Sequence, residues 1–185
     1  MRLRLRAEEP GATYHVYARG VDRRRIFADD ADYRRYTDLL AVISERKGWR
    51  LLCYCLMPNH VHLMIETPET NLGAGIQWLH SRYALAFNHR HSRTGHLFEN
   101  RFRSPKLRTD GAFVRLVGYV VANPVAASLC TRADEWEWGS HALVGGEEPT
   151  PSWLAHARLL ERLDAMTAAD RAYELVVATF EGSRR

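Results

Sequence analysis

Two runs of strand-forming residues joined by a Pro-Asn turn constrain the fold more than any other part of the chain. The first run covers residues 49–56, the turn is Pro58-Asn59, and the second run extends from His60 to about Glu66. Side chains alternate between the two faces of a strand, so His60 and His62 share one face. The other face takes the apolar residues Val61, Leu63 and Ile65. The pattern predicts a β-hairpin whose second strand presents a histidine pair.

The spacing of this pair suits a metal ion. On a strand, the Cα atoms of His60 and His62 are about 6.5–7 Å apart, so both imidazoles can reach one ion at about 2 Å. A second His-x-His pair, His89 and His91, ends a segment with helical periodicity. Residues two apart on a helix point about 200° apart, so we expect that pair to face solvent or phosphate.

Periodicity and capping residues place the other elements. The expected strands cover 13–19 and 96–107, and the expected helices cover about 30–46, a long segment after Asn71, and Asp110 to about Asn123. The last helix must end near Asn123 because Pro124 disfavours helical geometry in the residue before it. The order β-α-β-β-α-β followed by a helix predicts the α+β class, with a ferredoxin-like antiparallel sheet and helices on one face.

The helix that begins at Asp110 is mostly apolar but carries one polar ridge. Arg115, Tyr119 and Asn123 are spaced four apart and therefore lie on one face. Taken alone, this ridge fits a helix with one wet side and Asn123 as its C-terminal cap. Taken together with the histidine pair, it supplies an amide oxygen as a third ligand position and a phenol one turn earlier.

The combination of these groups favours phosphodiester chemistry. A hard divalent cation with few protein ligands keeps positions open for phosphate oxygens. A tyrosine with a pKa near 10 is a weak nucleophile at neutral pH, so nearby positive charge must favour its phenolate. Attack by Tyr119 would give a phosphotyrosine intermediate that conserves the bond energy for rejoining.

The C-terminal part of the chain differs in composition. After Trp138 the sequence becomes rich in Gly, Glu and Pro between Gly145 and Pro151, and a helical pattern follows over about 153–180. We predict a catalytic domain over 1–145 and a helical extension over 146–185 that packs on it.

Charge is distributed unevenly along the chain, whose net charge is +4. Residues 1–110 contain 19 Lys and Arg against 12 Asp and Glu, whereas residues 111–185 contain 7 against 10. The positive part holds the histidine pair and points to a polyanionic partner. No stretch approaches 18 consecutive apolar residues, so we expect no membrane span. Three cysteines without a spacing framework suit a reducing cytosol.

Three strings of this sequence resemble the single-tyrosine HUH transposases, and most closely their REP-associated tyrosine transposase branch. They are Met57-Pro58-Asn59-His60-Val61-His62, Gly95-His96-Leu97-Phe98-Glu99-Asn100-Arg101-Phe102 and Tyr119-Val120-Val121-Ala122-Asn123-Pro124-Val125. Shorter matches are Tyr14-His15-Val16, Arg19-Gly20 and Trp136-Glu137-Trp138. The resemblance covers roughly residues 12–145.

The resemblance implies a metal-dependent enzyme that uses Mg²⁺ or Mn²⁺ and cleaves single-stranded DNA near hairpins. It implies a 5′-phosphotyrosine link and a free 3′-hydroxyl. Carried over, His60 and His62 are metal ligands, Tyr119 is the nucleophile and Asn123 is the third ligand. Related insertion-sequence transposases often have glutamine at that last position, and Glu66, on the same strand face as His62, is the alternative.

The same resemblance implies single-stranded DNA and REP-like palindromic hairpins as partners, a monomer or homodimer, and a cytoplasmic, nucleoid-associated location in a bacterium. We expect four arginines to contact the DNA: Arg19, Arg101, Arg103 and Arg115.

Other interpretations remain open from the sequence. The chain could be an inactive hairpin-binding module of the same fold, or a metallohydrolase that uses activated water. Cys53 and Cys55 could join the histidine pair at a zinc ion, although their spacing fits no common structural pattern. We expect His15 to be a packed or hydrogen-bonded core histidine, with a place near the metal as the alternative. The aromatic residues Tyr14, Tyr17, Phe98 and Phe102 are predicted to be core rather than base-stacking platforms.

Overall fold

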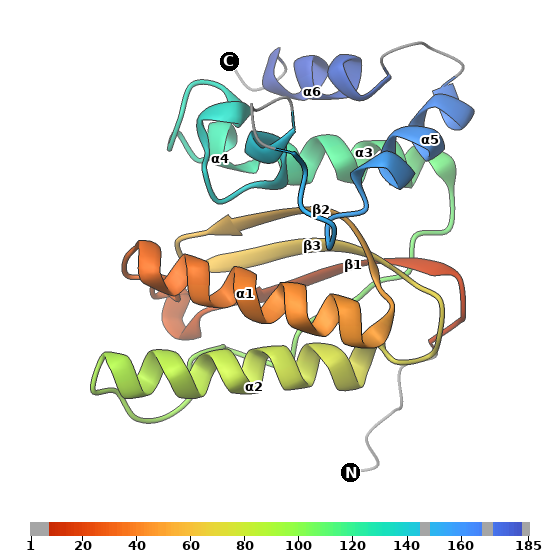
Figure 1. The fold of residues 1–185 in the computed structure, drawn as a ribbon. Coiled ribbons are helices and arrows are strands. Elements are labelled where there is room, and N and C mark those ends of the chain that lie inside the picture. Colours follow the sequence, from red (N-terminus) through yellow and green to blue (C-terminus); the bar gives the residue numbers. More distant parts are fainter. Residues whose placement is uncertain (1–7, 145–148, 168–171, 183–185) are drawn as a thin grey trace.

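A three-stranded antiparallel sheet forms the centre of the computed structural model, which describes residues 8–144, 149–167 and 172–182 (Figure 1). Its strands are β1 (Ala12–Arg19), β2 (Arg50–Met57) and β3 (His60–Thr67), in the order β1-β3-β2. The predicted hairpin is therefore confirmed, and its histidine-bearing strand is the central one. Register pairs Tyr17 of β1 and Cys55 of β2 with His62.

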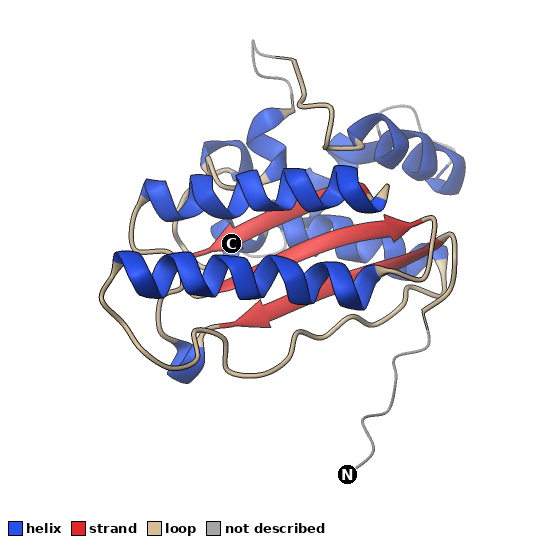
Figure 2. Cartoon of the chain, turned by 60° about the horizontal axis from the view of Figure 1, so that its bottom comes forward, coloured by secondary structure: helices blue, strands red, loops and turns tan. Residues whose placement is uncertain are grey.

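Helices α1 (Asp30–Lys47) and α2 (Leu72–Arg90) lie side by side on one face of the sheet (Figure 2). The α1 helix begins where the Asp29 carboxylate accepts the amides of Ala31 and Asp32, as expected of a capping aspartate. It ends at Gly48, whose φ of 62° is a left-handed conformation that glycine adopts without strain. The apolar stripe of α1 packs with Val61, Leu63 and Ile65 of β3 in one core cluster.

The opposite face of the sheet is covered by α3 (Asp110–Val121) and α5 (His156–Thr167), and α6 (Ala172–Gly182) packs on these two helices (Figure 1). Met64 of β3 belongs to this second core cluster with Phe113, Val117 and Val120 of α3. The alternation of side chains along β3 is thus confirmed, because its neighbours Leu63 and Ile65 belong to the other cluster. The α+β class is confirmed as well.

The predicted fourth strand over 96–107 is wrong in detail. This segment runs antiparallel along the outer edge of β1, but it contributes only isolated bridges: Gly20 with Phe98, Tyr17 with Arg103, and Tyr14 with Lys106. Two features explain the interruption. The pairing shifts by two residues between the first two bridges, as in a bulge, and Pro105 has no amide to donate. The segment still satisfies part of the β1 edge, since the His15 amide donates to the Pro105 carbonyl.

The predicted end of helix α3 near Asn123 is confirmed, but the predicted reason is not, because Asn123 itself begins the next helix. Helix α3 ends at Val121, and a short helix α4 (Asn123–Ala126) begins with Pro124 in its first turn. Three 3₁₀ turns complete the described elements: η1 (Val21–Arg23), η2 (Ala133–Glu135) and η3 (Ser140–Leu143).

The described part of the C-terminal extension is helical, as predicted: α5 packs on β2, and α6 packs on α3 and α5. The predicted domain boundary at 145/146 lies outside the described residues and stays a prediction. No helix in the described ranges is both long and apolar enough to cross a membrane.

Candidate active site

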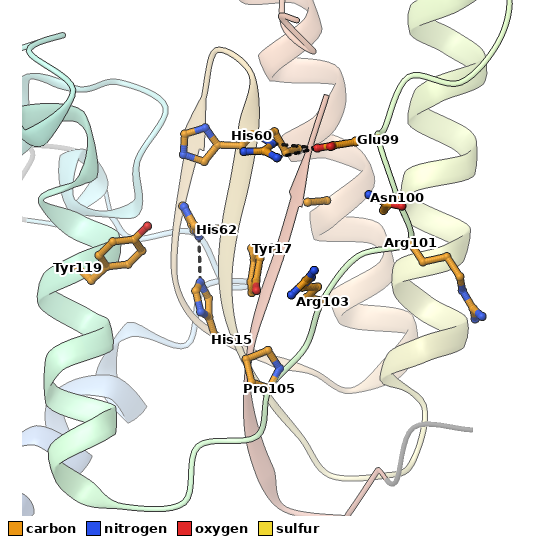
Figure 3. Close-up of a pocket in the computed structure, with 12 residues that line it drawn as sticks. His15, Tyr17, His60, His62, Glu99, Asn100, Arg101, Arg103, Pro105 and Tyr119 are labelled. Atoms are coloured by element: carbon orange, nitrogen blue, oxygen red, sulfur yellow. Dashed lines mark hydrogen bonds and ion pairs between the residues drawn. The ribbon is translucent and has the colours of Figure 1, made fainter. Parts of the chain in front are cut away.

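A cavity of about 770 Å³ opens between β1, β3, α3 and the irregular segment after Gly95 (Figure 3). It brings together six of the eight residues predicted to carry function, and the exceptions are Asn123 and Arg115. Its lining residues are His15, Tyr17, Ala18, Arg19, His60, His62, Glu99, Asn100, Arg101, Arg103, Pro105 and Tyr119.

The histidine pair lies on one wall of this cavity, as its spacing predicts. The ring centroids of His60 and His62 are 4.9 Å apart, and the His60 ring contacts the Asn59 side-chain oxygen through Nδ1 at 2.6 Å. Only 5% of His62 is exposed, and its Nδ1 lies 2.9 Å from Nε2 of His15. The other ring nitrogen of His62, Nε2, is buried without a hydrogen-bond partner among the described residues.

Burial keeps these imidazoles neutral. Loss of solvent lowers the pKa of His62 to about 2, with smaller contributions from His60 and His15. Burial also lowers the pKa of His15 to about 4. The pKa of His60 is lowered by burial too, although a side-chain hydrogen bond with Asn123 opposes that shift. A neutral imidazole has a free lone pair, so each ring is in the form that binds a metal ion.

Asn123 does not line the cavity but reaches its histidine wall. Asn123 is 7% exposed at the start of α4, and it lies close enough to His60 to raise the pKa of that imidazole against the effect of burial. Its role as the third ligand stays a prediction.

Tyr119 approaches the same wall from α3. Its ring lies edge-on to that of His62, with centroids 5.2 Å apart and planes at 81°, and 6.2 Å from the ring of His15. Its hydroxyl points toward the side of the cavity where the two strand histidines lie (Figure 3). The α3 helix that positions Tyr119 is capped by Thr109, whose side chain accepts the Ala112 amide.

The predicted arginines occupy different places. Arg19 and Glu99 form an ion pair at 2.8 Å on the cavity wall, with about half of each side chain exposed. Arg103 lies next to Tyr17, whereas the Arg101 side chain extends away from the histidines (Figure 3). Arg115 is exposed on α3 and does not line the cavity.

Besides His15, five lining residues were not predicted as site residues: Tyr17, Ala18, Glu99, Asn100 and Pro105. His15 proves to be hydrogen-bonded, and it lies at the site itself rather than in the core. Tyr17, expected in the core, is half-buried and lines the cavity, while Tyr14 and Phe102 are core residues. The available signal was alternation, since His15, Tyr17 and Arg19 share a strand face. It becomes informative only once β1 is known to pair with β3.

The carboxylate of Glu66 is paired with arginines outside the cavity. Its buried carboxylate receives Arg50 at 2.6 Å, Arg162 at 3.1 Å and Arg158 at 3.6 Å, and it does not line the cavity. These contacts argue against Glu66 as the third ligand. Within the described part of the chain, no group of three or more His, Cys, Asp or Glu residues could hold a metal ion. The zinc alternative with Cys53 and Cys55 therefore finds no support.

The second His-x-His pair does not converge. His89 is exposed, whereas His91 contacts the buried carboxylate of Asp32 at 2.9 Å. The helical geometry separates the two rings as expected.

Comparisons with known proteins agree with this fold. Residues 10–121 match the family model described as IS200-like transposase, which is more than half of the chain. The chain therefore belongs to the IS200-like transposase family. A solved structure of a REP-associated tyrosine transposase bound to a REP hairpin is similar to it, with a TM-score of 0.65 and 16% identity over 81% of this chain and 90% of that one.

A crystal structure of a transposase candidate from Deinococcus radiodurans R1 is also similar, with a TM-score of 0.44 and 18% identity over 60% of this chain and 89% of that one. No curated protein sequence matches. The REP-associated structure shows that the two chains share a fold, and family membership supports a transposase-like function with DNA as the partner.

Proposed function

We propose that the protein is a metal-dependent single-stranded DNA nickase and strand transferase that forms a 5′-phosphotyrosine link through Tyr119. One observation supports this most directly. Tyr119 and His62 line one cavity within one chain, and the buried Nε2 of His62 has no hydrogen-bond partner among the described residues. A nucleophile and an unused metal-ligand atom in one cleft are what such a reaction requires.

The donor set fits a divalent ion. His60 and His62 would hold Mg²⁺ or Mn²⁺, with the Asn123 amide oxygen as third ligand, and the neutral imidazoles and buried His62 Nε2 support this set. When bound, the ion would act as a Lewis acid on a phosphate oxygen.

The chain's own residues account for the remaining steps. Tyr119 Oη forms a bond to phosphorus while the bond from phosphorus to the 3′-oxygen breaks, and the phenolic proton is lost as the leaving oxygen gains one. The arginines of the cavity wall, Arg19, Arg101 and Arg103, hold the flanking phosphates, and Arg115 extends these contacts along α3. Because the link to Tyr119 conserves the phosphodiester energy, a 3′-hydroxyl can reverse the attack and join strands.

We infer that the DNA partner is single-stranded DNA next to a hairpin, of the REP-like palindromic kind. The similar REP-associated transposase is bound to a REP hairpin, and the part of this chain that builds most of the cavity carries the excess of positive charge. The protein acts as a monomer or homodimer in the bacterial cytoplasm, associated with the nucleoid.

A covalent-adduct assay tests this function. The protein is incubated with a labelled hairpin oligonucleotide and Mn²⁺, and a band that survives denaturation is expected. Tyr119→Phe and His60→Ala should lose the band. Tyr17→Phe is the matched control, because it removes a phenol of the same cavity and should keep it.

The two alternatives give different results in the same assay. Hairpin binding without an adduct in the wild-type protein would leave an inactive binding module. Cleavage that persists in Tyr119→Phe would show that water is the nucleophile.

A further inference from the structure

The contact between His15 and His62 joins two neighbouring strands inside the cavity. His62 pairs across the sheet with Tyr17, so His15, two residues earlier on the same face of β1, is its diagonal neighbour. The distance of 2.9 Å between His15 Nε2 and His62 Nδ1 is that of a hydrogen bond. Nothing in the sequence of the histidine pair itself indicates this third imidazole.

A hydrogen bond between two neutral imidazoles contains one proton. The ring that carries this proton determines whether Nε2 of His62 has a lone pair or a hydrogen. If His62 donates its Nδ1–H, then Nε2 carries a lone pair. If His15 donates instead, Nε2 of His62 carries the proton. That proton would be buried with no acceptor among the described residues. Buried N–H groups without an acceptor are rare in folded proteins, so the first arrangement is favoured.

We propose that His15 is a positioning residue that accepts the Nδ1–H of His62 and thereby leaves the lone pair of His62 on Nε2. The function of that lone pair as a metal ligand rests on the proposed function. The tautomer of His62 does not. Histidines that bind metal ions commonly donate their other N–H to a fixed acceptor, which sets the tautomer and the ring orientation.

The surroundings of His15 show why its ring has to be replaced with care. It lies between the rings of Tyr17 and Tyr119, with centroids 5.0 Å and 6.2 Å away. A small residue would open a void beside the nucleophile, and its effect could be one of packing alone. His15→Gln keeps a side-chain acceptor, whereas His15→Met has a similar length without a strong one, so the two variants separate hydrogen bonding from volume.

The test is ¹⁵N NMR of the full chain with labelled histidine, in the absence of metal. We expect wild-type His62 to show a protonated Nδ1 and an unprotonated Nε2, and His15→Gln to keep this pattern. In His15→Met the Nε2–H form of His62 should appear. Wild-type His62 in the Nε2–H form, or an unchanged tautomer in His15→Met, would overturn the proposal. If His15→Met fails to fold, the wild-type and His15→Gln spectra still decide which nitrogen of His62 carries the proton.

Calorimetric titration with Mn²⁺ gives the second readout. We expect the Kd to rise by about 10–100-fold in His15→Met and to stay near the wild-type value in His15→Gln. His89→Gln, at an exposed position of α2, is the control and should bind like the wild-type protein. A wild-type protein that binds no Mn²⁺ would contradict the proposed function, while the tautomer of His62 would still decide the role of His15.

Discussion

Gly118 of α3, the residue before the proposed nucleophile Tyr119, packs directly against the ring of Phe180 of α6. A Cβ at position 118 would lie 2.2 Å from Phe180 Cδ2, so only glycine allows this approach. The C-terminal extension therefore supports the helix that positions Tyr119, and the sequence contains a residue dedicated to that contact.

Gly118→Ala should destabilise the protein despite its better helix propensity. The substitution gains up to about 1 kcal/mol from helix propensity, whereas overpacking of this kind usually loses about 1–3 kcal/mol. We expect a net loss of about 1–2 kcal/mol in urea unfolding. Gly111→Ala in the same helix is the control, because its Cβ would meet only the flexible end of Arg115 at 3.3 Å. Equal stabilities of the two variants would contradict the tight contact.

The third ligand can be assigned by comparing Asn123 with Glu66. Asn123→Ala should weaken Mn²⁺ binding, because it removes the amide oxygen proposed as the third ligand. Glu66→Gln should leave Mn²⁺ binding unchanged and lower stability by about 1–2 kcal/mol, because it weakens charged hydrogen bonds to partly exposed arginines. Titration calorimetry and urea unfolding of both variants measure the two effects, and the reverse pattern would make Glu66 the ligand.

His80 should make stability depend on pH. It is buried in α2, hydrogen-bonded to the Tyr36 hydroxyl at 3.2 Å and stacked on Phe98, and burial lowers its pKa to about 3. Below about 6.5 the unfolded chain binds a proton that the folded chain excludes. The contribution of His80 is therefore complete above pH 6.5 and is lost as the pH falls toward 3, by at most about 1.4 kcal/mol per pH unit.

The variant His80→Gln should flatten this dependence. Urea unfolding at pH 7, 6 and 5 should show a smaller decrease in its free energy of unfolding than in that of the wild-type protein. His89→Gln, exposed on the same helix, should keep the wild-type slope. The same slope in His80→Gln as in the wild-type protein would show that His80 is not excluded from protonation.

Arg19 and Glu99 form an ion pair, and neutralising each of them should change DNA affinity in opposite directions. Glu99→Gln removes a negative charge from the cavity wall and frees Arg19, so hairpin affinity should rise. Arg19→Gln should lower the affinity and reduce the slope of log K against log salt by about 0.7 for a single-stranded contact. Fluorescence anisotropy at several salt concentrations measures both. Arg35→Gln is the control because Arg35 is exposed on α1, whose helix covers the other face of the sheet. Weaker binding by Glu99→Gln would contradict this role.

The sequence pattern predicted those features that interactions between neighbouring residues determine. The alternation of His60 and His62 with Val61 and Leu63 identified both the strand and its two faces, since a strand has only two. The predicted strand over 96–107 failed because local residue types do not reveal a shift in pairing with β1. Pro105 already indicated that the strand could not be continuous, because proline has no amide hydrogen to donate to a neighbouring strand.

Contacts between segments far apart in the sequence could not be predicted, because they also depend on how distant elements pair and pack. The place of His15 at the cavity depends on the register of β1 against β3, and 47 residues separate it from its partner His62. The contact of Gly118 with Phe180 likewise depends on how α6 docks on α3. In both cases the residue types are compatible with several environments, and only the packing of distant elements selects one.

Locating the DNA attachment within the chain tests the central claim most directly. The adduct formed with a hairpin oligonucleotide and Mn²⁺ is digested with trypsin and nuclease, and the nucleotide-bearing peptide is sequenced by mass spectrometry. We expect a 5′-phosphotyrosine at Tyr119, in the peptide covering residues 116–132. A link at Tyr17, in the peptide covering residues 7–19, or cleaved DNA with no linked peptide, would contradict it.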